Sequence, residues 1–467
     1  MTGVAGRCPS HDPADRRGGV DAAPGGGPTQ VRADAMGNRA GGPRRVGALR
    51  AGLAGVVLGL GLAGCASTGA SGPATTAPAA SSSPSAAFYT PPSPLPTAAP
   101  GTLIRSVQVR GVPGVPAGAT VWRILYHSTS IYGADVAESG YVIAPAAAAP
   151  AGGYPVIAWA HGTSGFAAPC GPSLFTDSGG GGPYLLPALD RYLRAGYVVS
   201  AADYQGLGVS DGVHPYLLGA SEGRSVLDAA RAAARLPGLR TAAEVVIYGH
   251  SQGGHAALFA AELAPTYAPD LHLVGVVAAA PATGLSTLIS IVGTPAGAQF
   301  LPYSIPTSWA WTQTYHDLPV SAVFTPSGAD FASTEVTHGC SGEVAVAITA
   351  HHLTPQGVFA PGAGSDPVVL AHARANDPGN VRTPVPMLVV QGTADGTVPP
   401  PLTDAYVTSK ACPIGDTVQY LHVPGATHGT VVYVAAPAIV AWMDARLAGT
   451  PAPSTCGQPG DVATLTP

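Results

Sequence analysis

The chain alternates short, almost unbroken apolar runs with segments of helical spacing from about residue 103 to residue 448. An unbroken apolar strand is typical of a strand buried on both faces, and the segments between such strands supply the covering helices. The expected strands are 121–126, 140–143, 155–160, 197–202, 244–248, 273–279, 386–390 and 418–423, and the expected helices are 185–195, 222–236, 254–263 and 437–448. The alternation predicts an α/β fold with a mostly parallel central sheet and helices on both faces.

A serine in the pattern GxSxG occurs three times, as GVSDG, GASEG and GHSQG. This pattern marks a nucleophile when it forms a tight turn from a strand into a helix, which presents the hydroxyl above the sheet. Only Ser251 directly follows a buried strand and directly precedes a helix. Ser210 is soon followed by His214-Pro215, which opposes a helix, and Ser221 is expected to be the N-cap of the helix from residue 222. Ser251 is therefore the expected nucleophile.

A serine hydroxyl needs a base to take its proton, so an acid and a histidine are expected later in the chain, each after a strand. Asp395 lies just beyond the apolar run 386–390, and His428 lies just beyond the run 418–423. The chain order of Ser251, Asp395 and His428 is the order that this arrangement requires. The three residues form the predicted catalytic triad.

Other polar side chains near these positions compete for the same roles or have simpler ones. Asp404 is an alternative acid, although it lies further from the strand end, and His428 could instead be an ordinary loop histidine. His422, inside an expected strand, is predicted to pack in the core. His250 and His255 flank the serine and are expected to shape the turn around it.

The oxyanion formed during acyl transfer needs preformed N–H donors. One is expected from the backbone of Gln252, directly after the nucleophile. The other is expected from Thr163, in the loop after the 155–160 strand, with its hydroxyl as a further donor. Gly165 or a neighbour is the alternative, in which case the His161-Gly162 turn only shapes the loop.

Charge and cysteine content exclude several function classes. Residues 66–467 carry 13 Lys and Arg against 22 Asp and Glu, a net charge of −9, which would repel nucleic acid. The six cysteines form no CxxC pair, and no zinc site, other metal site or cofactor motif is indicated. Four cysteines follow residue 65, and this even number suggests two disulfides in an exported chain.

The N-terminal segment has the features of an export signal. Arg44, Arg45 and Arg50 precede an apolar run over 51–63, which is shorter than the roughly 20 residues that span a bilayer. The run ends in Leu-Ala-Gly-Cys, which resembles the bacterial lipobox, so Cys65 is the expected lipidated first residue of the mature chain. An ordinary secretory signal with a chance cysteine is the alternative.

These features divide the chain into expected parts. Residues 1–35 are either an upstream extension or the result of a misplaced start, since Met36 begins a segment of normal signal length. Residues 36–65 form the signal peptide, and 66–100 a flexible tether rich in Ser, Pro and Ala. A catalytic domain is expected over 101–450, followed by a tail over 451–467.

Four segments together resemble the secretory lipase family: AWAHGT at 158–163, DYQGLG at 203–208, YGHSQGG at 248–254 and GTAD at 392–395. The resemblance extends over roughly residues 100–450. It implies the α/β-hydrolase fold, a cap or lid insertion at about 281–383, and hydrolysis of triacylglycerols or other carboxylic esters. It also implies two disulfides, Cys170–Cys340 and Cys412–Cys456.

The expected insertion departs from the family pattern. Its sequence is rich in Gly and Pro, so helices of a large lid are hard to define in it, and action on aggregated lipid is a weaker expectation than ester hydrolysis. It also carries an aromatic patch that either lines an acyl pocket or forms the core of the cap itself: Phe300, Tyr303, Trp309, Trp311 and Tyr315.

The sequence therefore predicts an exported serine ester hydrolase, lipid-anchored at the cell surface or secreted, acting on a small-molecule or lipid ester. A peptidase or amidase on the same fold is the first alternative. A non-catalytic surface lipoprotein that uses a hydrolase scaffold for binding is the second, and the complete triad argues against it.

Overall fold

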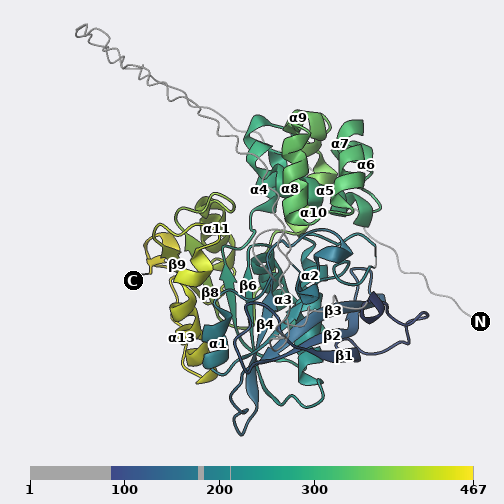
Figure 1. Ribbon diagram of the computed structural model, residues 1–467. Coiled ribbons are helices and arrows are strands. Elements are labelled where there is room, and N and C mark those ends of the chain that lie inside the picture. Colours follow the sequence, from purple (N-terminus) through teal and green to yellow (C-terminus); the bar gives the residue numbers. More distant parts are fainter. Residues whose placement is uncertain (1–85, 177–183, 211, 466–467) are drawn as a thin grey trace, which may run out of the picture. The chain divides into compact units, whose positions relative to one another are not determined.

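A computed structural model describes residues 86–176, 184–210 and 212–465 of the chain (Figure 1). The expected upstream extension, the signal peptide with Cys65, and most of the expected tether lie outside the described residues. Within the described ranges, no helix combines the length and the apolar character needed to cross a membrane.

One sheet of ten strands forms the centre of the domain, in the order β1-β2-β3-β5-β4-β6-β7-β8-β9-β10. The pairs β1–β2, β2–β3 and β3–β5 are antiparallel, whereas every pair from β5–β4 to β9–β10 is parallel. The strands are Leu103–Val109, Thr120–Thr129, Asp135–Ala144, Tyr154–Ala160, Val198–Ala202, Thr241–His250, His272–Ala279, Met387–Gly392, Val418–Val423 and Ala463–Thr464, for β1 to β10 in turn. The predicted mostly parallel sheet is present.

Helices cover both faces of this sheet. On one face α2 (Gly219–Ala234) and α3 (Gln252–Tyr267) pack onto the strands through alanine-rich surfaces, which let the helices approach closely. On the other face α1 (Leu189–Arg194) and α13 (Ala436–Leu447) enclose a second core. The short helices α11 (Pro400–Tyr406) and α12 (Val431–Val434) follow β8 and β9.

A cap of short helices lies between β7 and β8. Its helices are α4 Leu285–Ser290, α5 Leu301–Thr314, α6 Val320–Val323, α7 Pro326–Phe331, α8 Ser341–Ala350, α9 Pro355–Val358 and α10 Pro367–Ala375. They enclose an apolar core of their own and gather at one end of the sheet (Figure 1). The stretch whose helices were hard to define from the sequence is therefore mainly helical, with short loops between the helices.

Residues on both sides of the expected 101–450 domain also pack onto it. Tyr89 is buried, and its hydroxyl lies 3.0 Å from the Ser173 Oγ. Near the C-terminus the Thr455 N–H donates to the Val418 carbonyl at 2.8 Å, and β10 adds a short strand beside β9. The compact domain therefore extends beyond residues 101–450 in both directions along the sequence.

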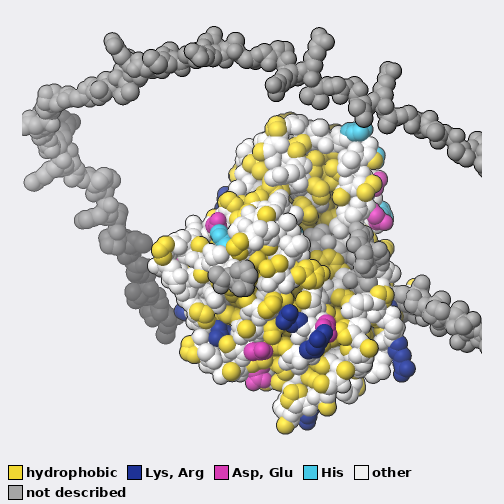
Figure 2. Space-filling model, turned by 60° about the vertical axis from the view of Figure 1, so that its left-hand side comes forward, with side chains coloured by type: hydrophobic (Ala, Val, Ile, Leu, Met, Phe, Trp, Pro, Cys, Tyr) yellow, Lys and Arg dark blue, Asp and Glu magenta, His cyan; other side chains and the backbone are white. Residues whose placement is uncertain are grey.

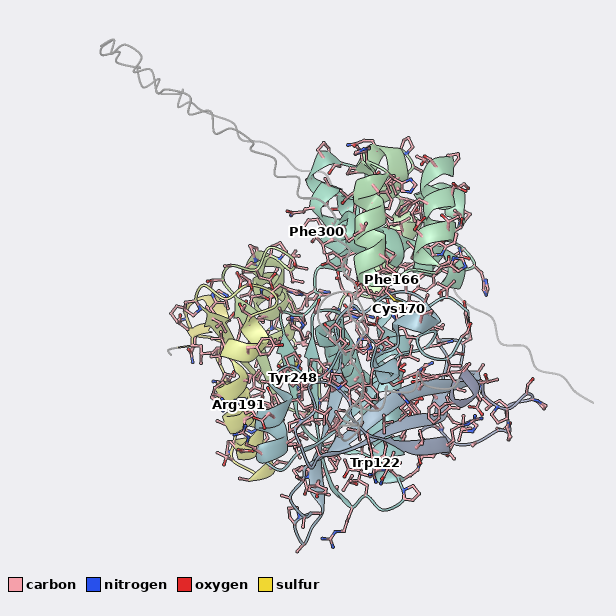
Figure 3. The ribbon with its side chains drawn as sticks, in the orientation of Figure 1. Trp122, Phe166, Cys170, Arg191, Tyr248 and Phe300 are labelled. Carbon is pink, nitrogen blue, oxygen red and sulfur yellow. A yellow bond between two sulfur atoms is a disulfide. The ribbon has the colours of Figure 1, made fainter. Side chains whose placement is uncertain are left out.

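Two disulfides are present, and they are the two that the resemblance implies. Cys170–Cys340 joins the loop after β4 to the residue that caps the start of α8, at the junction of sheet and cap (Figure 3). Cys412–Cys456 ties the C-terminal segment to the region after α11. Their sequence separations of 170 and 44 residues correspond to about 5 and 4 kcal/mol of loop-closure entropy removed from the unfolded chain.

Two expected helix starts are wrong. Helix α2 begins at Gly219 with Leu218 as its N-cap, so Ser221 lies inside the first turn and is not the N-cap. The Glu222 carboxylate accepts the Leu217 N–H at 2.8 Å and satisfies a donor just before the helix, a role expected of a capping serine. Helix α1 begins at Leu189, four residues after the expected start at 185.

Candidate active site

Ser251 occupies the turn between β6 and α3. Its φ and ψ of 60° and −121° place a non-glycine residue in a strained region of backbone space. The flanking glycines permit this geometry, because a Cβ on Gly249 would lie 1.8 Å from the Gly253 carbonyl oxygen, and one on Gly253 would lie 1.9 Å from that of Ala160. The turn therefore has the strain and close packing of a nucleophile elbow.

The other two GxSxG serines occupy different settings. Ser210 is exposed in the loop after β5. Ser221 is buried in α2, where its hydroxyl lies 3.4 Å from the Gln205 side-chain oxygen. Neither serine lies at a turn from a strand into a helix.

Asp395 and His428 meet through the loops that follow β8 and β9. The His428 Nδ1 donates to the Asp395 Oδ2 at 2.8 Å, and the Asp395 Oδ1 accepts the N–H groups of Thr397 and Val398 at 2.9 Å each. Burial raises the pKa of Asp395, but the hydrogen bond and charge of His428 and the two backbone donors outweigh it, so the pKa falls below its usual value. The acid is held ionised, with one oxygen directed at the imidazole.

His428 also contacts the elbow. The Nε2 of His250, the residue before Ser251, donates to the His428 carbonyl oxygen at 3.0 Å, and the two rings lie 4.7 Å apart between centroids. Burial, with a smaller contribution from His428, lowers the pKa of His250 to about 3, so its ring stays neutral. Among the described residues, no hydrogen bond joins the Ser251 hydroxyl to His428, although the imidazole is held beside the serine's neighbour.

The two expected oxyanion donors are available. Within the described ranges, neither the Gln252 nor the Thr163 backbone N–H donates a hydrogen bond. A Cβ on Gly162 would lie 3.4 Å from the Ser251 Cβ, which places the loop after β4 directly against the nucleophile. The Thr163 hydroxyl is engaged elsewhere, since it lies 2.7 Å from the Tyr216 hydroxyl.

A buried carboxylate that the sequence did not single out supports this turn. The Gln252 Nε2 donates to the Glu222 Oε1 at 2.7 Å and to the His214 Nε2 at 3.0 Å. The other carboxylate oxygen of Glu222 lies 3.0 Å from the His255 Nδ1. Glu222 lies four residues into an Ala-rich helix, and no local sequence signal distinguishes it from an exposed acid. His255 does lie against the elbow, as expected.

The alternative acid, Asp404, lies in a separate cluster. Its Oδ1 accepts the Tyr420 hydroxyl at 2.6 Å and the His422 Nε2 at 2.9 Å. His422 is therefore half-buried and paired with an acid, which corrects the expectation that it packs in the core. The carboxylate that contacts His428 is Asp395.

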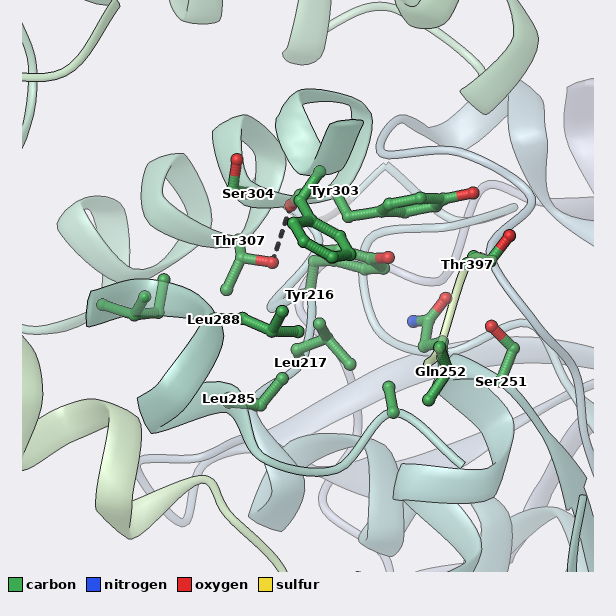
Figure 4. Close-up of a pocket in the computed structure, with 14 residues that line it drawn as sticks. Tyr216, Leu217, Ser251, Gln252, Leu285, Leu288, Tyr303, Ser304, Thr307 and Thr397 are labelled. Carbon is green, nitrogen blue, oxygen red and sulfur yellow. Dashed lines mark hydrogen bonds between the residues drawn. The ribbon is translucent and has the colours of Figure 1, made fainter. Parts of the chain in front are cut away.

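A small, mostly apolar cavity opens at Ser251 (Figure 4). Its walls come from the loop before α2, from α4 and from the start of α5, and the side chains that form them include Tyr216, Leu217, Leu285, Leu288, Phe300 and Tyr303. The aromatic patch of the cap is thus divided between its two expected roles. Phe300 and Tyr303 line the cavity, whereas Trp309 and Trp311 are buried in the core of the cap. Tyr315 packs against that core and stacks on His372.

No cluster of His, Cys, Asp and Glu suited to a metal ion occurs in the part of the chain that the structure describes. On the face shown in Figure 2, charged side chains are few and scattered among uncharged and apolar ones.

Comparisons with known proteins identify relatives among lipases. The model of the family described as secretory lipase matches residues 186–455. A probable inactive lipase of Mycobacterium tuberculosis is 33% identical over 203 residues, which cover 42% of this chain and 44% of that protein. Lipase 6 of Candida albicans is 25% identical over 399 residues, which cover 79% of this chain and 82% of that protein. The first match therefore spans less than half of the relative's length, and the second spans most of it.

Solved structures show the same architecture. Candida antarctica lipase A superposes with a TM-score of 0.68 at 21% identity, over 81% of this chain and 89% of that one. The rice cell wall degrading esterase LipA from Xanthomonas oryzae superposes with a TM-score of 0.62 at 21% identity, over 76% of this chain and 100% of that one. At these identities the likeness concerns the fold, and it confirms the predicted fold class.

Proposed function

The chain belongs to the secretory lipase family, and on that premise we propose that it is an exported hydrolase of carboxylic esters that forms an acyl-enzyme on Ser251. The observation that carries the proposal is the convergence of three chain segments. Ser251 occupies the strained elbow, and the hydrogen-bonded pair of Asp395 and His428 lies against the residue before it.

In the proposed acylation step, the Ser251 Oγ attacks the ester carbonyl carbon while the His428 Nε2 takes the hydroxyl proton. The carbonyl oxygen becomes an oxyanion, which accepts hydrogen bonds from the backbone N–H groups of Gln252 and Thr163. The tetrahedral intermediate then collapses. The bond from the carbonyl carbon to the alcohol oxygen breaks, His428 gives its proton to that oxygen, and the alcohol leaves.

Deacylation repeats these steps with water. His428 takes a proton from a water molecule as its oxygen attacks the acyl carbon, and the same two N–H groups hold the second oxyanion. Collapse returns the proton to the Ser251 Oγ and releases the carboxylic acid. Asp395 stays ionised throughout and keeps the Nδ1 proton of His428 directed towards itself, which leaves Nε2 free to exchange protons.

The test is covalent labelling with a fluorophosphonate probe, which reacts with activated serines. We expect one modified residue, Ser251, identified by mass spectrometry of the digested protein, because among the three GxSxG serines only this one lies beside the Asp395–His428 pair. Ser210 and Ser221 are built-in controls on the same chain. Labelling at either of them instead would contradict the assignment of Ser251 as the nucleophile. An unlabelled Ser251 in folded protein would favour a non-catalytic role, as the name of the Mycobacterium tuberculosis relative indicates for that protein.

We further propose that the mature chain is anchored at the cell surface through a lipid on Cys65. The proposal rests on the basic residues, the short apolar run and the Leu-Ala-Gly-Cys sequence that ends it. The secretory family and the two disulfides are consistent with export.

In cells that express the chain, Cys65→Ser is expected to move it from the membrane fraction to the medium, because a thioether-linked lipid cannot form on serine. Immunoblotting of the two fractions measures the shift. Cys8→Ser, which changes the other cysteine outside the disulfides, is the matched control and is expected to leave the distribution unchanged. Equal fractionation of wild type and Cys65→Ser would contradict the anchor and leave an ordinary secretory signal.

A further inference from the structure

The cavity that opens at Ser251 is small. Its volume is about 50 Å³, whereas pockets for drug-sized ligands typically hold roughly 300–1,000 Å³. The cavity is therefore far smaller than a pocket that encloses a whole drug-sized ligand. Most of its wall is apolar, which suits hydrocarbon groups. An acyl chain that starts at the Ser251 oxygen would fill it within a few carbons.

The cap helices that form this wall are fixed to the rest of the domain. Within the cap, the Asp377 carboxylate accepts the backbone N–H of Leu285 at the start of α4. The Asn376 Nδ2 donates to the Tyr315 hydroxyl at 2.8 Å, at the end of α5, and its Oδ1 accepts the Gly219 N–H of α2 at 3.0 Å. The buried amide of Asn376 thus links the cap to a helix that packs on the sheet.

A second tie lies at the start of α8. The Cys170–Cys340 disulfide is flanked by two backbone hydrogen bonds between the loop after β4 and the cap. They run from the Phe166 N–H to the Gly339 carbonyl and from the Ser341 N–H to the Ser164 carbonyl, each at 3.1 Å. Moving the cap away from the nucleophile would therefore break hydrogen bonds, including the buried one between Asn376 and Gly219. We therefore expect the cavity to keep this size when an acyl group is bound to Ser251.

We propose that the enzyme selects short acyl groups, and that Leu288 and Phe300 set this limit. The proposal rests on the proposed function, because it concerns the acyl group carried by Ser251. Leu288 lies in α4 and lines the cavity (Figure 4). Phe300, the residue directly before α5, lines it as well. A longer chain would have to overlap these side chains, at a cost comparable to overpacking a core.

The experiment measures kcat/KM for p-nitrophenyl esters from acetate to decanoate, each kept below the concentration at which it aggregates. In the wild type we expect a maximum at acetate to butyrate and a fall of at least about 50-fold by decanoate, since one unaccommodated methylene changes kcat/KM by about 10- to 200-fold. Tributyrin and triolein emulsions extend the series to lipid substrates, and only tributyrin is expected to be hydrolysed at a measurable rate.

The Leu288→Ala variant removes one side chain from the wall. It is expected to raise kcat/KM for hexanoate and octanoate by about 10-fold relative to butyrate. Leu353→Ala is the matched control, because Leu353 packs against the same cap core but does not line the cavity. It should leave the chain-length profile unchanged. A circular dichroism melt of each variant separates a changed profile from a damaged fold.

Two results would overturn the short-chain limit: a wild-type kcat/KM that keeps rising from butyrate to decanoate, or a Leu288→Ala profile that matches that of Leu353→Ala. Failure of the proposed function gives a different result. In that case no ester of any length is hydrolysed, and the fluorophosphonate probe leaves Ser251 unlabelled.

Discussion

Ser251→Ala is expected to lower kcat for p-nitrophenyl butyrate by at least about 10⁴-fold. The variant lacks the atom that forms the acyl-enzyme, so only direct attack of water on bound ester remains. The fold should be retained, since the Ser251 hydroxyl makes no hydrogen bond among the described residues and alanine is the closest replacement for a residue at φ 60°. Initial rates with purified protein, together with its thermal melt, measure both effects.

The chain supplies matched controls for this variant. Ser221→Ala removes a buried hydroxyl from another GxSxG pattern, and Ser210→Ala removes an exposed one. Both are expected to keep kcat within about threefold of the wild type. If Ser251→Ala retained more than a tenth of the wild-type rate, the nucleophile would have to be sought elsewhere.

Asp395→Asn is expected to lower kcat by about 10³- to 10⁴-fold, with a smaller effect on KM. The asparagine can still accept the N–H groups of Thr397 and Val398 through its carbonyl oxygen. Its amide nitrogen then faces the Nδ1 of His428 and favours the tautomer with the proton on Nε2. That tautomer cannot take the proton of Ser251. Steady-state kinetics on the folded variant test this.

Asp404→Asn is the control that distinguishes the two candidate acids. Asp404 binds Tyr420 and His422, so the variant should change kcat by less than about threefold even if stability falls. A loss of activity in Asp404→Asn that exceeds the loss in Asp395→Asn would assign the catalytic acid to Asp404.

The difference in unfolding free energy between the wild type and Asp395→Asn should also depend on pH. Because the folded-state pKa of Asp395 is lower than its usual value, its ionisation stabilises the native state at a pH above the usual range of an aspartate. That contribution is lost as the pH falls through the lowered pKa. Denaturant melts should therefore show the difference in unfolding free energy between the wild type and Asp395→Asn shrinking towards acid pH.

The central part of the fold was predictable because its strands are buried on both faces. Strand β9 has the bounds that its apolar run indicates, and β4 and β8 differ from theirs by one or two residues. Each of these strands is followed by a loop that carries a proposed site residue. Parallel strands direct their carboxyl ends to the same edge of a sheet, so the order of the apolar runs was enough to place Asp395 beside His428.

The cap was not predictable in the same way. Several of its helices have only four to six residues, and the longest, α5, contains Pro306 in its interior. Short helices around a small separate core bury side chains on several sides, so the periodicity of a single apolar face is lost. The division of the aromatic patch between cavity and core therefore required coordinates.

The support beneath the nucleophile was missed for a related reason. Glu222 contacts Gln252 and His255 across about thirty residues of chain, and such contacts leave no local pattern. Its position in an amphipathic helix resembles that of a solvated acid, and only the packing of α2 against α3 shows that it is buried.

The Cys170–Cys340 bond makes the maturation of the enzyme depend on where the chain folds. Its first cysteine belongs to the same loop as Thr163, and its second caps the first turn of α8 in the cap. Disulfides persist in oxidising compartments and are rare in the reducing cytoplasm. Formation of this bond, which ties the cap to the loop of Thr163, therefore requires an oxidising compartment, and a recombinant host has to provide the same redox conditions.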